Sequence, residues 1–108
     1  MFGNKAQMQS MMKKARKMQE DMEKAKEKIK SMTVDVTVGG GAVSLTMTGE
    51  HQIQTLTVSP DALDPSDPEM LVDLITTAVN EASRKADEMV AAEMQKITSG
   101  LSLPGGLF

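Results

Sequence analysis

The chain has 108 residues and a formal net charge of −3, with 12 Lys and Arg against 15 Asp and Glu. It contains no Cys, which excludes disulfides, zinc–thiolate sites and a thiol nucleophile. Its only aromatic residues are Phe2 and Phe108, so the middle of the chain offers no platform for stacking the bases of a single strand. No apolar run approaches the roughly 20 residues of a membrane span, and lysines interrupt the N-terminal segment where a signal peptide needs an apolar core. These features predict one soluble, cytoplasmic domain over residues 1–108, without a membrane partner.

The charge is divided unevenly along the chain. Residues 1–32 carry a net charge of +5, whereas residues 33–108 carry −8. A charge run is usually a solvated helix face, but segregation by segment also favours an anion-binding surface. Two interpretations of the basic segment therefore stay open at this point.

Residues 4–32 are predicted to form a long helix, because their interior lacks Gly and Pro and is rich in Met, Lys, Gln, Glu and Ala. Apolar residues recur there at alternating spacings of three and four, the period of two helices packed along each other. This seam consists of Met8, Met11, Ala15, Met18, Met22, Ala25, Ile29 and Met32. At about 1.5 Å per residue the helix is about 40 Å long, against a radius of gyration of about 13 Å for a compact domain of this size. We therefore expect a projecting arm whose seam is covered by a second copy, in a homodimer. The main interface stays open: the first helix on the partner's first or second helix, or pairing through the Thr-rich sheet face or an edge strand.

Residues 33–58 change to a period of two, which predicts a three-stranded antiparallel sheet with one apolar face and one Thr-rich face. Ile53 falls on the Thr side of the third strand, so the pattern does not decide which face of the sheet Ile53 lies on. Residues 39–41 are three consecutive glycines between two predicted strands. They lack the Lys and Ser/Thr of a phosphate-binding loop and favour a hairpin turn.

A second helix is predicted over residues 68–98. Two starts are open: a capping box formed by Ser66 and Glu69, or Asp67 as N-cap with Pro68 at the first helical position. Its apolar face consists of Leu71, Leu74, Ile75, Ala78, Ala82, Ala86, Met89, Val90, Met94 and Ile97. Gly100 stops the helix, and residues 99–108 are expected to form a flexible tail. The fold class is thus α+β, with the order α-β-β-β-α.

The sequence shows no pattern typical of an enzyme. The single histidine, His51, lies in a predicted turn without a nucleophile or further metal ligands near it in sequence. The acidic residues of the 61–69 loop lack the Gly and the terminal Glu of a calcium-binding loop. We expect no catalytic residue, no cofactor, no metal and no small-molecule substrate.

The cations around the seam are the strongest candidate for a binding site. Phosphate contacts require little more than Lys and Arg on an accessible face, and they give affinity that tolerates any sequence and weakens with salt. Arg84 and Lys85 on the second helix add to this set, although carboxylates surround them in sequence. The residues expected to bind double-stranded DNA are Lys5, Lys13, Lys14, Arg16, Lys17, Lys24, Arg84 and Lys85.

Seven short segments of the chain, taken in order, form a recognisable set: 1–4, 11–19, 43–49, 58–60, 73–75, 78–82 and 103–105, which read MFGN, MMKKARKMQ, VSLTMTG, VSP, DLI, AVNEA and LPG. With this set, nearly the whole chain resembles the YbaB/EbfC family of bacterial nucleoid-associated proteins. The resemblance implies a tweezer-like homodimer, with helical arms projecting from a central sheet region. It also implies DNA binding in nucleoid organisation and, in some members, gene regulation or recombination and repair.

Family DNA contacts are attributed to the helices. The resemblance carries them here to Lys13, Lys14, Arg16 and Lys17, and to Arg84 and Lys85, where the family helix also tends to be basic. The acidic second helix and sheet depart from basic members and weaken the expected affinity. The expected function is therefore sequence-tolerant binding of duplex DNA by a nucleoid-associated homodimer. The alternative is a non-enzymatic adaptor that binds another protein through the Met-rich seam or the apolar tail.

Overall fold

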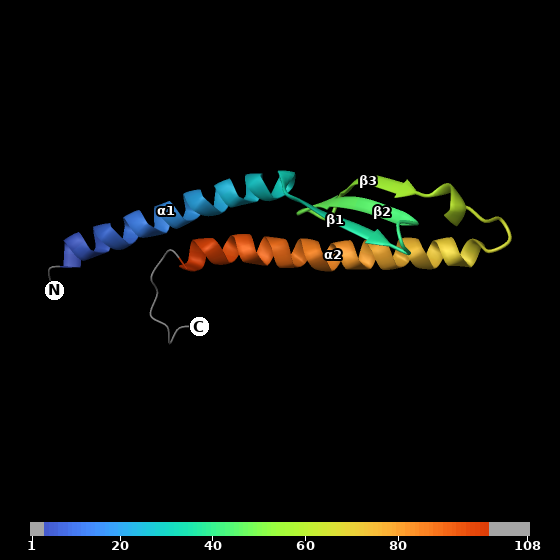
Figure 1. Cartoon of the computed structure of the whole chain (residues 1–108). Helices are drawn as coiled ribbons and strands as arrows, with labels where there is room; N and C mark the ends of the chain where they lie inside the picture. The colour runs from blue at the N-terminus through green and yellow to red at the C-terminus, as the bar shows by residue number, and fades with distance from the viewer. Residues whose placement is uncertain (1–3, 100–108) are drawn as a thin grey trace.

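The computed structural model describes residues 4–99 of the chain (Figure 1). Its elements are α1 (Asn4–Ser31), β1 (Thr33–Val38), β2 (Val43–Thr48), β3 (Ile53–Val58), the short 3-10 helix η1 (Pro60–Ala62) and α2 (Pro68–Ser99). The predicted α+β class and α-β-β-β-α order are confirmed. The first helix ends one residue earlier than predicted, and the second ends one residue later, at Ser99. The rest of the predicted flexible tail lies outside the described residues.

The three strands form an antiparallel sheet in the order β1-β2-β3, as the period of two predicts. The glycines of the β1–β2 hairpin have φ values of +65°, +65° and +99°, a left-handed conformation that glycine adopts without steric cost. Hydroxyls on the outer face bond between the strands: Thr46 Oγ1 donates to Asp35 Oδ1 at 2.7 Å. One face of the sheet is therefore polar, as predicted.

A bulge in the β2–β3 pairing decides which way Ile53 points. Thr46 pairs with Thr55, but Met47 pairs with Ile53, so Gln54 has no partner across the ladder. Directly paired residues share a face of the sheet, and Met47 is buried on the face that packs against α2. Ile53 thus lies on the apolar face. A strict period of two cannot show this, because the extra residue shifts the alternation by one.

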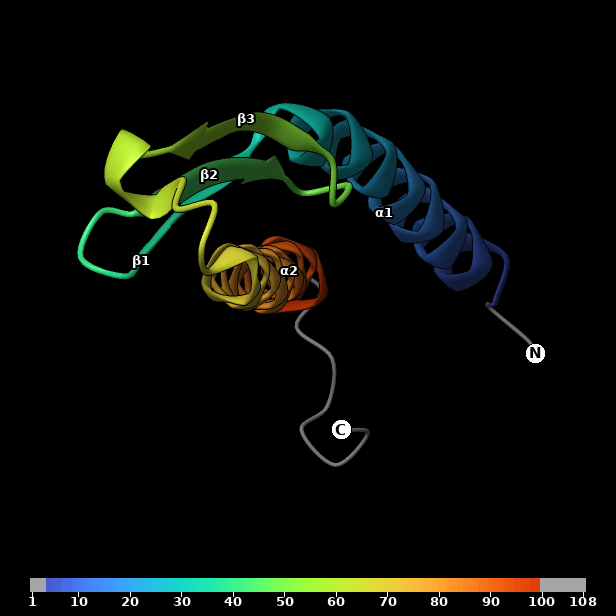
Figure 2. The ribbon, with the colours of Figure 1, turned by 90° about the vertical axis from the view of Figure 1, so that its right-hand side faces the viewer.

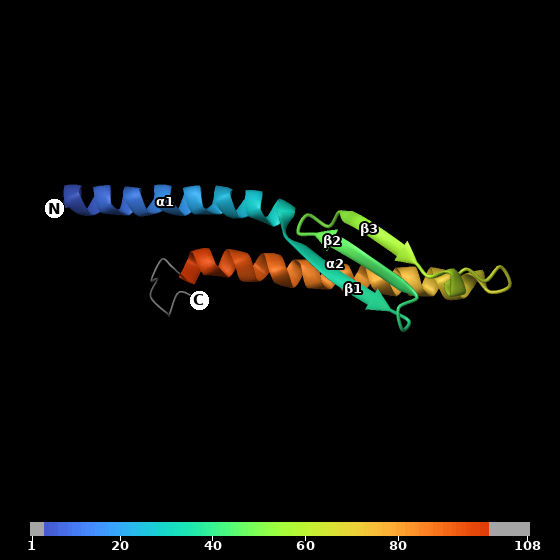
Figure 3. The same ribbon diagram turned by 45° about the horizontal axis from the view of Figure 1, so that its top comes forward.

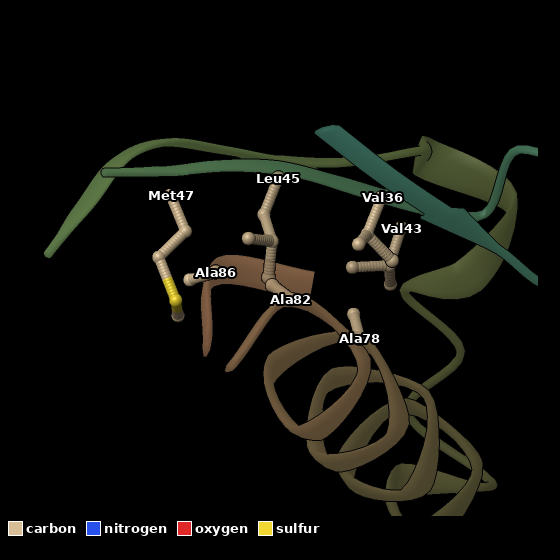
Figure 4. Close-up of a cluster of buried hydrophobic side chains, with 7 residues drawn as sticks. All are labelled: Val36, Val43, Leu45, Met47, Ala78, Ala82 and Ala86. Carbon is tan, nitrogen blue, oxygen red and sulfur yellow. The ribbon is translucent and has the colours of Figure 1, made fainter. Parts of the chain in front are cut away.

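The core lies between the inner face of β1 and β2 and one side of α2 (Figure 4). On α2 this side is formed by Ala78, Ala82 and Ala86, which are spaced four residues apart and fully buried. Small side chains let the helix approach the sheet closely, and the strands fill the space with larger ones. The buried strand residues are Val36, Val43, Leu45 and Met47.

Asp67 begins α2, with Pro68 at the first helical position. The backbone N–H of Met70 donates to Asp67 Oδ1 at 3.2 Å, the bond that an N-cap carboxylate accepts. Ser66 instead donates its N–H and its hydroxyl to Asp64 Oδ1, at 2.9 and 2.7 Å. α2 therefore begins with the Asp67 N-cap and not with the capping box of Ser66 and Glu69.

The molecule is elongated, with principal extents of 78 × 26 × 16 Å. Seen along α2, the sheet lies on one side of that helix, and α1 continues beyond the sheet (Figure 2). α1 and α2 lie antiparallel, and the first turns of α1 project past the end of α2 (Figures 1 and 3). The end of α1 is fixed to the sheet at Gly49, whose N–H donates to the Met32 carbonyl at 3.0 Å. A side chain has no room there, because a Cβ on Gly49 would lie 2.6 Å from the Ile29 carbonyl oxygen.

Candidate nucleic-acid interface

The N-terminal half of α1 is exposed on all sides. Every residue from 5 to 17 is exposed, and we call this segment the free arm. Met11, a residue of the seam, exposes 63% of its surface. Farther along α1 the seam is covered, because Ala25 and Ile29 are buried. The structure therefore divides the predicted seam into a half that packs within the chain and a half that does not.

Five of the nine Lys and Arg on α1 have no carboxylate partner. Among the described residues 4–99, six Lys and Arg lie more than 4.0 Å from every carboxylate oxygen, and the one outside α1 is Lys85. The other five lie on α1, and we call them the unpaired cations: Lys5, Lys13, Lys14, Arg16 and Lys24. At 3.6 residues per turn, Lys13, Arg16 and Lys24 lie on the side of α1 away from the seam. A long anion lying along this side would meet several of them at once.

Three other α1 lysines form ion pairs within their own helix. Lys17 Nζ lies 3.2 Å from Asp21 Oδ1, and Lys26 and Lys30 pair with Glu23 and Glu27 at 3.6 and 2.7 Å. The hydrogen bond and charge of Glu27 raise the pKa of Lys30 above its usual value. Exposed pairs of this kind contribute little energy. A phosphate can therefore compete with Asp21 for Lys17, but each such contact also uncovers a carboxylate.

Arg84 and Lys85 lie elsewhere, on α2 beside the sheet. Arg84 Nη1 donates to both carboxylate oxygens of Glu88, at 2.6 and 3.0 Å, and Nη2 donates to Glu81. These bonds raise the pKa of Arg84, and the hydrogen bond from Arg84 lowers the pKa of Glu81. Lys85 Nζ donates to the Asp35 carbonyl at 3.4 Å. The structure thus brings six of the eight predicted residues together on α1 and places these two in an acidic neighbourhood.

Glu93 is a residue of the helix junction that sequence reasoning missed. It lies on the apolar face of α2, its side chain is 9% exposed, and its two oxygens accept from Lys28 Nζ at 2.9 Å and Lys96 Nζ at 3.2 Å. The hydrogen bonds from Lys28 and Lys96 lower the pKa of Glu93 below its usual value. The pair with Lys28 connects α2 to α1 and sets how the arm lies. Its signal in the sequence was a single Glu within the apolar face, three residues before a Lys.

A groove follows the junction of the two helices. It has a volume of about 610 Å³, and its walls are mostly apolar. The residues that line it are Met18 and Met22 from α1, and Ala91, Met94, Gln95, Ile97 and Thr98 from α2. Methionine is unbranched and adapts to irregular apolar partners. This side of the arm is chemically distinct from the cationic side.

Other kinds of site were sought in the described part of the chain. Residues 4–99 contain no group of three or more His, Asp or Glu placed to hold a metal ion. None of the described helices is long and apolar enough to cross a bilayer. His51 lies in the β2–β3 turn with φ 64°, and its Nε2 is 2.8 Å from Asp87 Oδ1. The predicted turn is confirmed, and the contact with Asp87 is an addition.

The comparison with known proteins identifies the family of the chain. The model of the YbaB/EbfC DNA-binding family matches residues 4–101, nearly the whole chain. This chain belongs to the YbaB/EbfC DNA-binding family. The resemblance indicated by the sequence is therefore confirmed, and it spans both helices and the sheet.

Relatives of this YbaB/EbfC chain are close. A nucleoid-associated protein of Ruminiclostridium cellulolyticum is 54% identical over 99 residues, covering 91% of this chain and 86% of the relative. A nucleoid-associated protein of Acetivibrio thermocellus is also 54% identical over 99 residues, covering 92% of this chain and 88% of the relative. An uncharacterized protein of Helicobacter pylori, known from a crystal structure, shares the fold with a TM-score of 0.69 at 19% identity. That match covers 87% of this chain and 96% of the other.

Proposed function

We propose that this protein is a nucleoid-associated protein that binds double-stranded DNA with little sequence preference, through the cations of α1 in a homodimer. The observation that carries the proposal is that five of the six cations without a carboxylate partner among the described residues lie on α1, the sixth being Lys85 on α2. The family and the names of the relatives support DNA as the ligand and the nucleoid as the setting. Regulation of gene expression would follow from occupancy of DNA near promoters.

The arm holds its positive charge away from the acidic body. The first carboxylate of the chain is Glu20, so Lys5, Lys13 and Arg16 precede every Asp and Glu. At about 1.5 Å per residue, Lys13 lies about 10 Å along α1 from Glu20, about one Debye length at physiological salt. In residues 33–108 the carboxylate that pairs with α1 is Glu93, and its partner Lys28 lies about 22 Å along the helix from Lys13, so the −8 of those residues is largely screened from the free arm. DNA can approach the arm without approaching the body.

The expected contacts are to the phosphate backbone. The described residues contain no aromatic side chain on which a base can stack, which disfavours single strands. Each neutralised phosphate adds about −0.9 to the slope of log affinity against log salt for duplex DNA. Because lysine recognises a phosphate as a charge, the affinity should depend weakly on base sequence.

An uncovered apolar surface supports the homodimer. α2 packs under β1 and β2 but leaves the inner face of β3 open, so Ile53 and Leu56 remain 44% and 45% exposed. Val72, at the side of α2, is 60% exposed. The accessible surface is 7645 Å², against about 5,800 Å² for a compact monomer of this mass. A second copy seated on β3 would cover these residues and place two arms in one molecule.

A salt titration of duplex binding tests the DNA proposal. Unrelated duplexes should bind with similar affinity, and Lys13→Glu with Arg16→Glu should lower the salt slope by about 1.8 per protomer. The matched control is Lys26→Glu with Lys30→Glu, which changes the net charge equally on the same helix at paired positions. Equal losses in the two variants would remove the unpaired cations as the site. No duplex binding at about 50 mM salt would remove the proposal.

Sedimentation of two neighbouring substitutions tests the dimer. Leu56→Asp places a charge on the open inner face of β3 and should shift the protein toward monomer at micromolar concentration. Thr57→Asp is the control, because Thr57 pairs with Ser44 on the outer, hydroxyl face of the same strand. A wild-type monomer at these concentrations contradicts the homodimer. Equal dissociation of both variants would exclude the inner face of β3 as the interface.

A further inference from the structure

The seam of α1 loses its cover at the point where α2 ends. Ile97 and Thr98, near the end of α2, line the groove together with Met18 and Met22. Beyond Met18 the seam continues through Ala15, Met11 and Met8, all of them exposed. The apolar groove and the uncovered seam therefore form one continuous surface along the arm.

The chain that follows α2 starts beside this surface and is long enough to cover it. α2 lies antiparallel to α1, so its last turn points toward the N-terminal end of α1 (Figures 1 and 3). From Met18 to Met8 the seam runs ten residues, about 15 Å. Nine residues follow Ser99 in the sequence, and fully extended they span about 30 Å. The segment is therefore long enough to contact the seam as far as Met8.

The composition of residues 100–108 suits an apolar, cationic arm. The segment has no charged side chain, and its large residues are Leu101, Leu103, Leu107 and Phe108. Its three Gly and one Pro disfavour a continuation of the helix, so the segment can lie extended in a groove. Burying its side chains together with the methionines of the seam removes apolar surface from water on both partners.

We infer that residues 101–108 pack on the seam of their own arm, over Met8, Met11 and Ala15, and extend the cover that α2 begins. A second copy of α1 is the competing occupant. Two free arms packed seam to seam would bring cations together, including Lys14 at the flank of the seam, with no carboxylate before Glu20 to balance them. The chain's own segment has no cationic side chain to repel the arm, and its attachment at Ser99 gives it a high effective concentration at the groove. We therefore expect this segment, and not a second copy of α1, to occupy the seam.

Engineered disulfides test the contact, because the chain has no Cys of its own. The test variant carries Met11→Cys and Leu103→Cys, and the control carries Lys13→Cys and Leu103→Cys. Residues 11 and 13 are both exposed and close in sequence, but residue 13 lies on the side of α1 away from the seam. Oxidation of dilute protein should close the intramolecular disulfide at least tenfold faster in the test variant. Alkylation rates of the single variants correct for thiol reactivity, and circular dichroism checks that helix content is unchanged.

Two results of the oxidation experiment would overturn the inference. Equal rates of closure in both variants mean that the segment does not prefer the seam. Predominant covalent dimers, seen on a non-reducing gel, mean that a second copy covers it. Deletion of residues 100–108 is an independent test: the methyl signals of Met8 and Met11 should shift, whereas that of Met12, off the seam, should not. Unchanged signals at Met8 and Met11 contradict the contact, and neither experiment uses DNA, so failure of the proposed function leaves them valid.

Discussion

The two ends of this molecule differ in how far their side chains are buried and in the sign of their charge. At the sheet end, three fully buried alanines let α2 lie against β1 and β2, and larger strand side chains fill the space between them. At the arm end, residues 5–17 of α1 are exposed on all sides and carry most of the unpaired cations. The first end is held by burial and is acidic, whereas the second is held by helix propensity and is basic. Stability and the proposed DNA contact therefore reside in different residues, and each can be changed separately.

Besides the apolar packing of Ala25 and Ile29, two further contacts join the ends. Gly49 lets the end of α1 lie directly on the β2–β3 turn, and Glu93 connects α2 to Lys28 on α1. Neither contact touches the unpaired cations. Both, however, determine where the arm points, so they should affect DNA binding only through the position of the arm.

Loss of a core side chain should produce the largest effect on stability. Leu45→Ala should lower the free energy of unfolding by about 2–5 kcal/mol, because Leu45 is buried against α2 and its loss leaves a cavity. Met12→Ala in the free arm should change it by no more than about 0.5 kcal/mol. Urea unfolding followed by circular dichroism gives both values. A similar cost at the two positions would contradict the contrast between the ends.

A methyl group at the junction should cost less than a core cavity. Gly49→Ala should lower the free energy of unfolding by about 1–3 kcal/mol, because its Cβ would meet the backbone and side chain of Ile29. Glu50→Ala, at the next and exposed position of the same turn, is the control and should be nearly neutral. An unchanged midpoint for Gly49→Ala would show that the end of α1 moves away freely.

Neutralising one arm cation should have a smaller effect, measured on DNA. Lys13→Gln should lower the salt slope of duplex binding by about 0.9 per protomer, which weakens low-salt affinity a few-fold. Lys17→Gln should lower it less, because Asp21 lies 3.2 Å from Lys17 and already offsets its charge. Fluorescence anisotropy at several salt concentrations separates the two. Equal decreases would show that the Lys17–Asp21 pair opens without cost on DNA.

The smallest effect should come from the carboxylate between the helices, and it should depend on pH. Pairing with Lys28 and Lys96 lowers the pKa of Glu93 in the folded protein, so its stabilisation is present above the unfolded value of 4.5. It is lost as the pH falls through the lower folded value. The difference in unfolding free energy between wild type and Glu93→Gln should therefore shrink between about pH 6 and pH 3.

The control for this pH dependence is Glu23→Gln. Glu23 is exposed and lies 3.6 Å from Lys26 within one helix, a kind of pair that contributes little. Unfolding in urea at several pH values measures both variants. A difference at Glu93 that grows as the pH falls would contradict the assigned pairing.

The order of elements could be predicted because each segment has one dominant period. The strands alternate apolar and polar residues, and both long helices lack internal Gly and Pro. The bulge at Gln54 could not be predicted, because one unpaired residue leaves no mark except an alternation that fails at Ile53. The sequence allowed either Asp67 or Ser66 as the N-cap of α2. In the structure Ser66 bonds to Asp64, and Asp67 accepts the cap hydrogen bond.

The candidate site divides in the same way. The sequence by itself determined that the first 32 residues form a basic helix with an apolar seam, since charge and period are properties of the chain alone. Only the tertiary structure decided which cations are free, because that depends on distance. It separated Lys13 and Arg16 from Arg84, which Glu81 and Glu88 hold, and it brought Glu93 to Lys28 across 65 positions. It also decided where α2 ends along α1, and hence which half of the seam remains to be covered.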